Sequence, residues 1–212
     1  FEVVTKSLRP LPEKYHGLAD QEIKYRKRYL DLICNDDTRN IFDIRFKAIR
    51  SIRNYFDEKG FVEVETPMMH KIPGGATARP FITHHNTLDM DLYMRIAPEL
   101  FLKRLIVGGF SKIFEINRNF RNEGVSSKHN PEFTMVEFYK TFSTYIDMMN
   151  LTEELIRKVV KEVKGSNKII YQEQELDFSK NFKRMTMIES ILEFYDDLDE
   201  LATGKVMSAF KK

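Results

Sequence analysis

Near the start of the chain, apolar positions recur with the spacing of an amphipathic helix. Asn35 or Asp36 is a suitable N-cap for this helix, and Gly60 supplies a left-handed stop. Asp20 is a suitable N-cap for an earlier helix over residues 21–34, so two helices are predicted here. The longer helix carries an apolar stripe, which must pack against another surface, formed by Ile41, Ile44, Ala48, Ile49, Ile52, Tyr55 and Phe56.

Two-residue alternation then predicts strands. Residues 61–66 alternate as a strand that Pro67 ends. Apolar and polar residues also alternate strictly over residues 88–96, which predicts a strand with one face in the core. A helix follows at once, because Pro98 suits the first helical position and the glycine pair 108–109 supplies a stop.

The next two strands carry the most informative pattern. Residues 112–123 and 131–142 are predicted to form an antiparallel hairpin joined by the loop 124–130. The two-residue period separates an apolar face from a face rich in charge and aromatic rings. By itself the pattern allows either a solvated surface or a binding site for the group on that second face, which consists of Arg121, Glu123, Phe133, Glu137 and Tyr139.

Regular patterns continue toward the end of the chain. An amphipathic helix is predicted over about residues 147–163, and a second hairpin over residues 167–180. Thr186 and Glu189 have the spacing of a capping box, which predicts a further helix. From Asp196 onward the pattern is weak.

The composition predicts a soluble globular protein with one large domain. The 212 residues are 42% hydrophobic and 31% charged, which is enough apolar material for a real core. The 34 basic and 32 acidic side chains give a net charge of only +2, so charge alone leaves nucleic-acid binding open.

Two features favour the cytoplasm as the compartment. The single cysteine, Cys34, cannot form an internal disulfide, and its apolar neighbours suit a packed structural thiol in a reducing environment. Apolar runs stay well below the roughly 18 residues that span a bilayer, and the N-terminus lacks the layout of a secretion signal. No membrane association is therefore expected.

Long segments of the chain resemble a known family. FRNEGVSSKHNPEFTMVEFY (120–139) closely resembles motif 2 of class II aminoacyl-tRNA synthetases, and FKAIRSIRNYFDEKGFVEVETPMM (46–69) resembles motif 1. Within that class, KYRKRYLDL, PGGATARPFITHHN, RIAPELFLKRL and HNPEFTMVEFY are similar to lysyl-tRNA synthetases, over about residues 1–195. The resemblance implies an α+β fold, with the antiparallel sheet and flanking helices of class II synthetases. It also implies a ligase that converts lysine and ATP to lysyl-adenylate and transfers lysine to tRNA(Lys).

The resemblance implies an ATP site on the hairpin. Arg121, the motif 2 arginine, would bridge the lysine carboxylate and the α-phosphate and stabilise the developing charge, which makes it the catalytic residue. A surface ion pair with Glu123 is the alternative for Arg121. By similarity Phe133 stacks under adenine, Glu123 lies near the base, and His129 and Asn130 complete the site.

The resemblance also implies a site for the two ammonium groups of lysine. Glu137 is the candidate partner of the ε-ammonium, and Tyr139 is a second contact to the substrate side chain. Gly75 and Glu99 match positions that hold the α-amino group. Glu99 has an alternative role, since a carboxylate in the first turn of a helix also stabilises the helix dipole.

Magnesium is expected with ATP, because it neutralises phosphate charge. The family's carboxylate ligands for it would lie beyond Lys212, so no metal ligand is predicted in this chain. His70, His84 and His85 do not change this, because no cysteine or carboxylate stands at ligand spacing to them.

The family pattern divides the chain into three parts. Residues 1–19 match the end of an N-terminal anticodon-binding barrel and its connector, and residues 20–195 match a catalytic domain with motifs 1 and 2. Residues 196–212 are left unassigned, with the start of a helical insertion as one interpretation. Motif 3, a glycine-spaced strand and helix ending in Glu-Arg, is absent from the sequence, so the chain is expected to hold a partial active site.

The resemblance leaves alternatives for partners and function. The motif 1 helix is expected to pack across a homodimer interface, with tRNA(Lys) as the macromolecular substrate. One rival is a paralogue that attaches a lysine-like group to a translation factor. The connector before residue 33 favours the synthetase, because it resembles the join between barrel and catalytic domain. A catalytically inactive fragment is the other rival.

Overall fold

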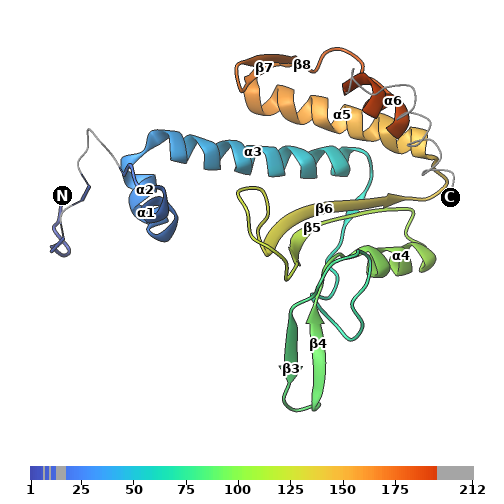
Figure 1. The fold of residues 1–212 in the computed structure, drawn as a ribbon, viewed down its shortest axis with the longest axis horizontal. Coiled ribbons are helices and arrows are strands. Elements are labelled where there is room, and N and C mark those ends of the chain that lie inside the picture. The colour runs from blue at the N-terminus through green and yellow to red at the C-terminus, as the bar shows by residue number, and fades with distance from the viewer. Residues whose placement is uncertain (7, 10, 13–17, 195–212) are drawn as a thin grey trace. The chain divides into compact units, whose positions relative to one another are not determined.

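The computed structural model describes residues 1–6, 8–9, 11–12 and 18–194. It forms two compact units, Phe1–Ser166 and Asn167–Lys212. The weak pattern predicted after Asp196 lies outside the described residues. Figure 1 shows the course of the chain, with helices α3 and α5 on one side of the β5–β6 ribbon and α4 on the other.

The first unit opens with three helices rather than the two predicted. The segment after Asp20 forms α1 (Gln21–Arg26) and α2 (Arg28–Cys34), because Lys27 leaves the helical region with φ −122° and ψ 54°. The Asp20 carboxylate accepts hydrogen bonds from two backbone amides of α1, which confirms it as the N-cap. Periodicity did not detect the break, because one nonhelical residue shifts the apolar spacing very little.

Helix α3 (Asp36–Glu58) is the longest helix of this unit. It begins after Asn35 as predicted, but the Asn35 side chain donates to the buried Asp31 carboxylate instead of capping the helix. It ends before Gly60, whose φ of +73° supplies the predicted left-handed stop. The apolar stripe divides in two, since its last residues are buried in the core whereas Ile41 remains 65% exposed.

The central sheet has the strand order β1-β5-β6, with bounds β1 Val62–Glu63, β5 Lys112–Phe120 and β6 Glu132–Lys140. Strands β5 and β6 form the predicted antiparallel hairpin. Strand β1 is much shorter than the predicted strand 61–66 and pairs parallel to β5. The α+β class with antiparallel strands and flanking helices is confirmed, and β1 adds one parallel pair to it.

A second sheet has the order β2-β4-β3, with bounds β2 Met69–His70, β3 Ile82–His85 and β4 Met90–Met94. Strand β4 is the centre of the predicted strand 88–96, while Leu88 lies outside it and is 62% exposed. Strand β3 was not predicted, because its residues are all exposed and show no apolar alternation. After β4 the chain turns into α4 (Glu99–Val107), with Pro98 at the N-cap position instead of the first helical position.

Aromatic rings hold the core of the first unit together. Phe56 of α3 is fully buried, and its ring centroid lies 4.7 Å from that of Phe114 and 5.0 Å from that of Phe138. Leu155 of α5 (Tyr145–Lys164) completes this cluster. The apolar face of the β5–β6 hairpin therefore packs on α3 and α5, and its polar face points away from the core.

The second unit contains the hairpin of β7 (Lys168–Tyr171) and β8 (Gln174–Asp177), followed by α6 (Met187–Phe194). Both elements were predicted. The capping box is present as well, because Thr186 and Glu189 exchange hydrogen bonds between side chain and backbone. In neither unit do the described residues include a helix with the length and apolarity to cross a membrane.

Candidate active site on the β5–β6 hairpin

The strand register decides which side chains of the hairpin share a face. Glu115 stands opposite Glu137, and Asn119 stands opposite Phe133. These residues are out of phase with Phe114 and Phe138, which point into the core. Phe133, Glu137 and Tyr139 therefore project from the face opposite to the core, as the two-residue period predicted.

One end of this face forms a hollow with a volume of about 300 Å³. It brings together all five residues predicted to form the ATP site, together with two that were not predicted. Its lining consists of Arg121, Glu123, Gly124, Lys128, His129, Asn130 and Phe133.

Arg121 and Phe133 form the floor of the hollow. The guanidinium carbon of Arg121 lies 5.2 Å from the centroid of the Phe133 ring, so the two planar groups are within the range of a cation–π contact. Arg121 Nε is buried, and no described side chain or backbone group accepts a hydrogen bond from it. Among the described residues Arg121 also forms no ion pair with Glu123. Nε of Arg121 therefore keeps an unused hydrogen-bond donor beside the hollow.

The loop between β5 and β6 forms the rim of the hollow. Backbone hydrogen bonds between Ser126 and His129 close a tight turn, and the Ser126 hydroxyl lies 2.8 Å from Nδ1 of His129. This contact leaves Nε2 of His129 as the ring nitrogen for a ligand. Glu123 also lines the hollow, and its carboxylate accepts a 3.3 Å hydrogen bond from the backbone amide of Arg79.

The other end of the face gathers the residues predicted to bind lysine. The Tyr139 hydroxyl donates a 2.7 Å hydrogen bond to the Glu137 carboxylate. Glu99, on the first turn of α4, lies close enough for its charge to act on both groups. Gly75 packs against this turn, because a Cβ added to Gly75 would lie 3.0 Å from the Glu99 Cβ.

The surroundings of Glu137 raise its pKa above the usual glutamate range. Partial burial is the largest cause, and the negative charges of Glu99 and Glu115 act in the same direction. The hydrogen bond from Tyr139 and the positive charge of Lys103 oppose the rise. A cation placed beside Glu137 would restore its charged form, so this end of the face is suited to bind an ammonium group.

Comparison with known proteins identifies the family of the chain. Residues 20–208 match the family described as tRNA synthetases class II (D, K and N). The chain belongs to this family.

Individual members of the family are also similar to this class II synthetase chain. It is 60% identical over 200 residues to the lysine–tRNA ligase of Nitrosomonas europaea, which covers 94% of the chain and 40% of the relative. Identity is again 60% over 211 residues with the lysine–tRNA ligase of Pelotomaculum thermopropionicum, which covers 100% of the chain and 42% of the relative. The chain thus spans about two fifths of the length of these relatives.

Sequence reasoning missed several residues around the candidate site of this class II synthetase chain. Lys128 had a detectable signal, since it is a cation in the motif 2 loop next to His129. Arg79 contributes its backbone amide to Glu123, and a pattern of side chains cannot reveal such a contact. Lys103 lies one helical turn beyond Glu99 and pairs with its carboxylate, with Nζ 2.5 Å from Oε1. The spacing of i and i+4 on the predicted helix could have revealed that pair.

Two described histidines outside the hollow, His70 and His84, have other partners in this synthetase fold. His70 is buried, and its Nε2 lies 2.8 Å from the carbonyl oxygen of Pro67. His84 pairs with Asp91, its partner across the β3–β4 hairpin, at 3.0 Å. Within the described ranges, no group of three His, Cys, Asp or Glu side chains is arranged to hold a metal ion.

The whole face therefore offers two kinds of chemistry side by side. The end with Arg121 and Phe133 presents a guanidinium, a flat apolar ring and loop cations, which suit a nucleotide with its phosphates. The end with Glu137 and Glu99 presents carboxylates in a partly buried setting, which suit ammonium groups.

Proposed function

We propose that this chain carries the part of a lysine–tRNA ligase that binds ATP and lysine. The observation that carries the proposal is the placement of the Arg121–Phe133 pair and the Glu137–Tyr139 pair on one face of the β5–β6 hairpin. The similarity to lysine–tRNA ligases over nearly the whole chain supports the same function.

In this proposal the hollow holds ATP. Phe133 stacks against the adenine ring, and Glu123 lies beside the base. His129, Lys128 and Asn130 face the phosphates from the loop. The buried Nε of Arg121, which lacks a protein partner among the described residues, is the observation that fits this group best.

Lysine binds at the carboxylate end. Glu137 pairs with the ε-ammonium, and Tyr139 both contacts the substrate side chain and orients the Glu137 carboxylate. Glu99 and the backbone at Gly75 hold the α-amino group. Because these groups are partly buried, an analogue without an ammonium would leave Glu137 unpaired, and the site would reject it strongly.

The reaction needs no covalent link to the enzyme. A lysine carboxylate oxygen attacks the α-phosphorus of ATP, a bond forms to give lysyl-adenylate, and the bond to pyrophosphate breaks. Arg121 orients the carboxylate and the α-phosphate and offsets the negative charge that develops between them. The lysyl group then passes to the terminal ribose of tRNA(Lys), and AMP leaves.

Several further partners belong to this proposal. Magnesium accompanies ATP as a counter-ion, but the described residues offer it no cluster of ligands, and none is assigned here. The proposed homodimer uses the motif 1 helix α3, whose first half exposes Ile41 and Phe46 by 65% and 58%. The cytoplasm is the proposed compartment.

The test uses lysine-dependent ATP–pyrophosphate exchange by the full-length protein. Exchange should depend on lysine, and Glu137→Gln should abolish it, because the amide cannot neutralise the ε-ammonium. Glu132→Gln is a matched control: Glu132 lies on the same strand, but on the other face, where it pairs with Arg118 at 3.5 Å.

Near-normal exchange by the Glu137 variant would remove Glu137 from this role. Isothermal titration separates the rival functions, since an inactive fragment should give no heat with lysine or with ATP. A paralogue that modifies a translation factor should activate its amino acid but leave tRNA(Lys) uncharged.

A further inference from the structure

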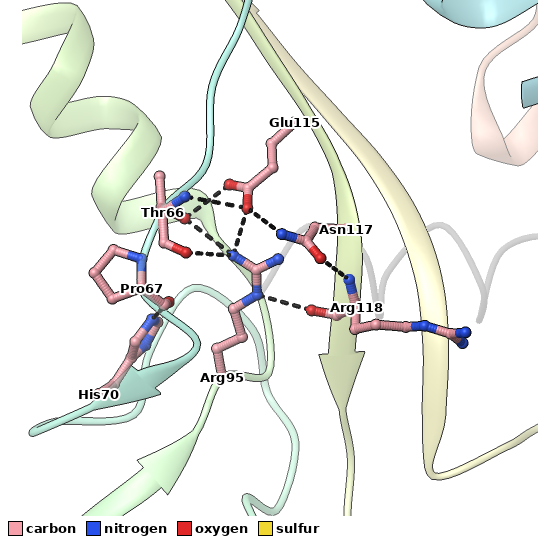
Figure 2. Close-up of polar contacts among 7 residues, drawn as sticks. All are labelled: Thr66, Pro67, His70, Arg95, Glu115, Asn117 and Arg118. Carbon is pink, nitrogen blue, oxygen red and sulfur yellow. Dashed lines mark hydrogen bonds and ion pairs between the residues drawn. The ribbon is translucent and has the colours of Figure 1, made fainter. Parts of the chain in front are cut away.

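Arg95 is buried completely between the two sheets of the first unit. Figure 2 shows its guanidinium facing Glu115 and Thr66. The Nη1 of Arg95 lies 2.7 Å from a Glu115 carboxylate oxygen and donates to the Thr66 hydroxyl at 3.0 Å. Thr66 also donates to the same carboxylate, through its backbone amide and its hydroxyl. Hydrogen bonds link the three residues pairwise, and those to the Glu115 carboxylate are charge-assisted, while Nη2 of Arg95 is buried without a partner among the described residues.

Arg95 also connects separate segments of the chain. Its Nε donates to the Arg118 carbonyl at 2.8 Å, and its own carbonyl accepts from the Phe120 amide at 2.9 Å, so β5 is held twice. Its backbone amide donates to the carbonyl of Met68, which lies just before β2. Because α4 begins only four residues after Arg95, these bonds fix where the first turn of α4 lies relative to β5.

Glu115 lies next to the carboxylate end of the candidate site. It is 1% exposed and stands directly opposite Glu137 in the β5–β6 register. Residues opposite each other in antiparallel strands have Cβ atoms about 4.5–5.5 Å apart. Without a cation at Glu115, two carboxylates would therefore face each other in a region of low solvent access, where like charges interact strongly.

We infer that Arg95 is a positioning residue of the lysine site. It binds Glu115, Thr66 and the β5 backbone in one buried unit, so that Glu99 is held against the strand face that carries Glu137 and the charge of Glu115 is neutralised. This inference rests on the proposed function, because the lysine site is defined there. Arg95 is not a catalytic residue, since it touches neither proposed substrate.

The groups that face Glu137 decide what a change at Arg95 should do. Tyr139 is on the same strand, Glu115 lies on β5, and Glu99 and Lys103 lie on α4. Lysine binding requires ionised Glu137, so affinity is present above the pKa of Glu137 and is lost as the pH falls through it. An unbalanced negative charge at Glu115 should raise the pKa of Glu137, and an unbalanced positive charge at Arg95 should lower it. The pH at which lysine affinity is lost should move with that pKa.

The experiment measures the KM for lysine as a function of pH in ATP–pyrophosphate exchange by the full-length protein. The acid limb of this profile is the pH range in which lysine affinity is lost as the pH falls. Arg95→Met leaves Glu115 unneutralised, so the acid limb should move to higher pH. Glu115→Gln removes the facing carboxylate and leaves Arg95 charged, so the same limb should move to lower pH. Each shift should be on the order of one pH unit, as expected for a single nearby charge.

The double variant and a charge-conserving variant separate charge from geometry. Arg95→Met combined with Glu115→Gln should return the acid limb close to its original position, because no net charge is left. Arg95→Lys keeps the charge but loses the bond from Nε to Arg118. It should leave the limb in place and raise the KM for lysine about tenfold, since small misplacements of binding groups are costly.

A matched control is Lys168→Met, which removes a cation from an exposed pair with Glu175 on the β7–β8 hairpin. It should change neither the KM for lysine nor the KM for ATP. A merely structural role for Arg95 predicts that the variants harm the KM for lysine and for ATP alike, with no opposite pH shifts, and that result would overturn the inference. If Arg95→Met does not fold, Glu115→Gln still shows whether the acid limb shifts. Absence of lysine-dependent exchange in the unchanged protein would overturn the proposed function, and the inference with it.

Discussion

The hydroxyl of Tyr139 lies 2.7 Å from the carboxylate of Glu137, two residues away on the same face of β6. Each group alters the pKa of the other. The hydrogen bond lowers the pKa of Glu137 against the larger effect of burial, and burial together with Glu137 raises the pKa of Tyr139. Tyr139 therefore stays protonated and donating at any physiological pH, while Glu137 is the titrating member of the pair.

Tyr139→Phe should weaken lysine binding most at low pH. Without the donated hydrogen bond the raised pKa of Glu137 should rise further, so the charged form that pairs with the ε-ammonium is lost at a higher pH. A hydrogen bond to a charged group is worth about 1.5–3 kcal/mol, which corresponds to roughly a tenfold or greater rise in the KM for lysine. The check is the KM for lysine across the acid limb, with the KM for ATP as the internal reference. A uniform effect at all pH values would contradict this account.

Gly75→Ala should disturb the α-amino end of the same site. Gly75 has φ +89°, and an added Cβ would lie 3.0 Å from the Glu99 Cβ and 3.3 Å from the Ala97 Cβ. The substitution should displace Glu99 and raise the KM for lysine about tenfold or more. Gly165→Ala is the control, because Gly165 has a similar φ of +73° but open space around its Cβ. Gly165→Ala should lower the free energy of unfolding without changing the KM for lysine.

The hairpin that carries the site could be predicted because its periodicity is strong and local. Strict alternation fixes which side chains share a face, and the register of Glu115 with Glu137 and of Asn119 with Phe133 agrees with that prediction. The glycine stop of α3 and the capping box at Thr186 were predictable for the same reason, since each depends on residues close together in the sequence.

Features that depend on distant residues could not be predicted in this way. Arg95 stands at a polar position of an alternating strand, so the pattern assigns it to solvent, yet it is completely buried. Its partners Thr66 and Glu115 are distant in the sequence, and only the folded chain brings the three together. The roles of the site residues remain predictions.

Phe133→Leu should weaken ATP binding selectively. The ring lies under the Arg121 guanidinium on the floor of the hollow, and leucine keeps the apolar volume but loses the flat surface for the base. Stacking of a base on an aromatic side chain contributes about 1–3 kcal/mol, so the KM for ATP should rise roughly fivefold to 150-fold. The KM for lysine should change much less. Phe110→Leu, at a ring that is 42% exposed, serves as the control.

Phe56→Ala should destabilise the first unit more than any change on its surface. The Phe56 side chain is fully buried, and its ring contacts four others, from Tyr55, Phe61, Phe114 and Phe138. Removing a buried phenylalanine ring lowers the free energy of unfolding by about 3–5 kcal/mol. Chemical denaturation followed by circular dichroism measures this loss.

Tyr145→Ala provides the comparison, because this ring is 76% exposed at the start of α5 and its loss should change the free energy of unfolding by only about 0.5 kcal/mol. The contrast bears on the site as well as on stability. Phe114 and Phe138 lie on the reverse side of the strands that carry Glu115 and Glu137, so a cavity at Phe56 should loosen the hairpin from behind. The Phe56 variant should therefore lose lysine and ATP binding together at temperatures where the protein is still folded. Unchanged binding in a strongly destabilised variant would show that the hairpin keeps its geometry without this core.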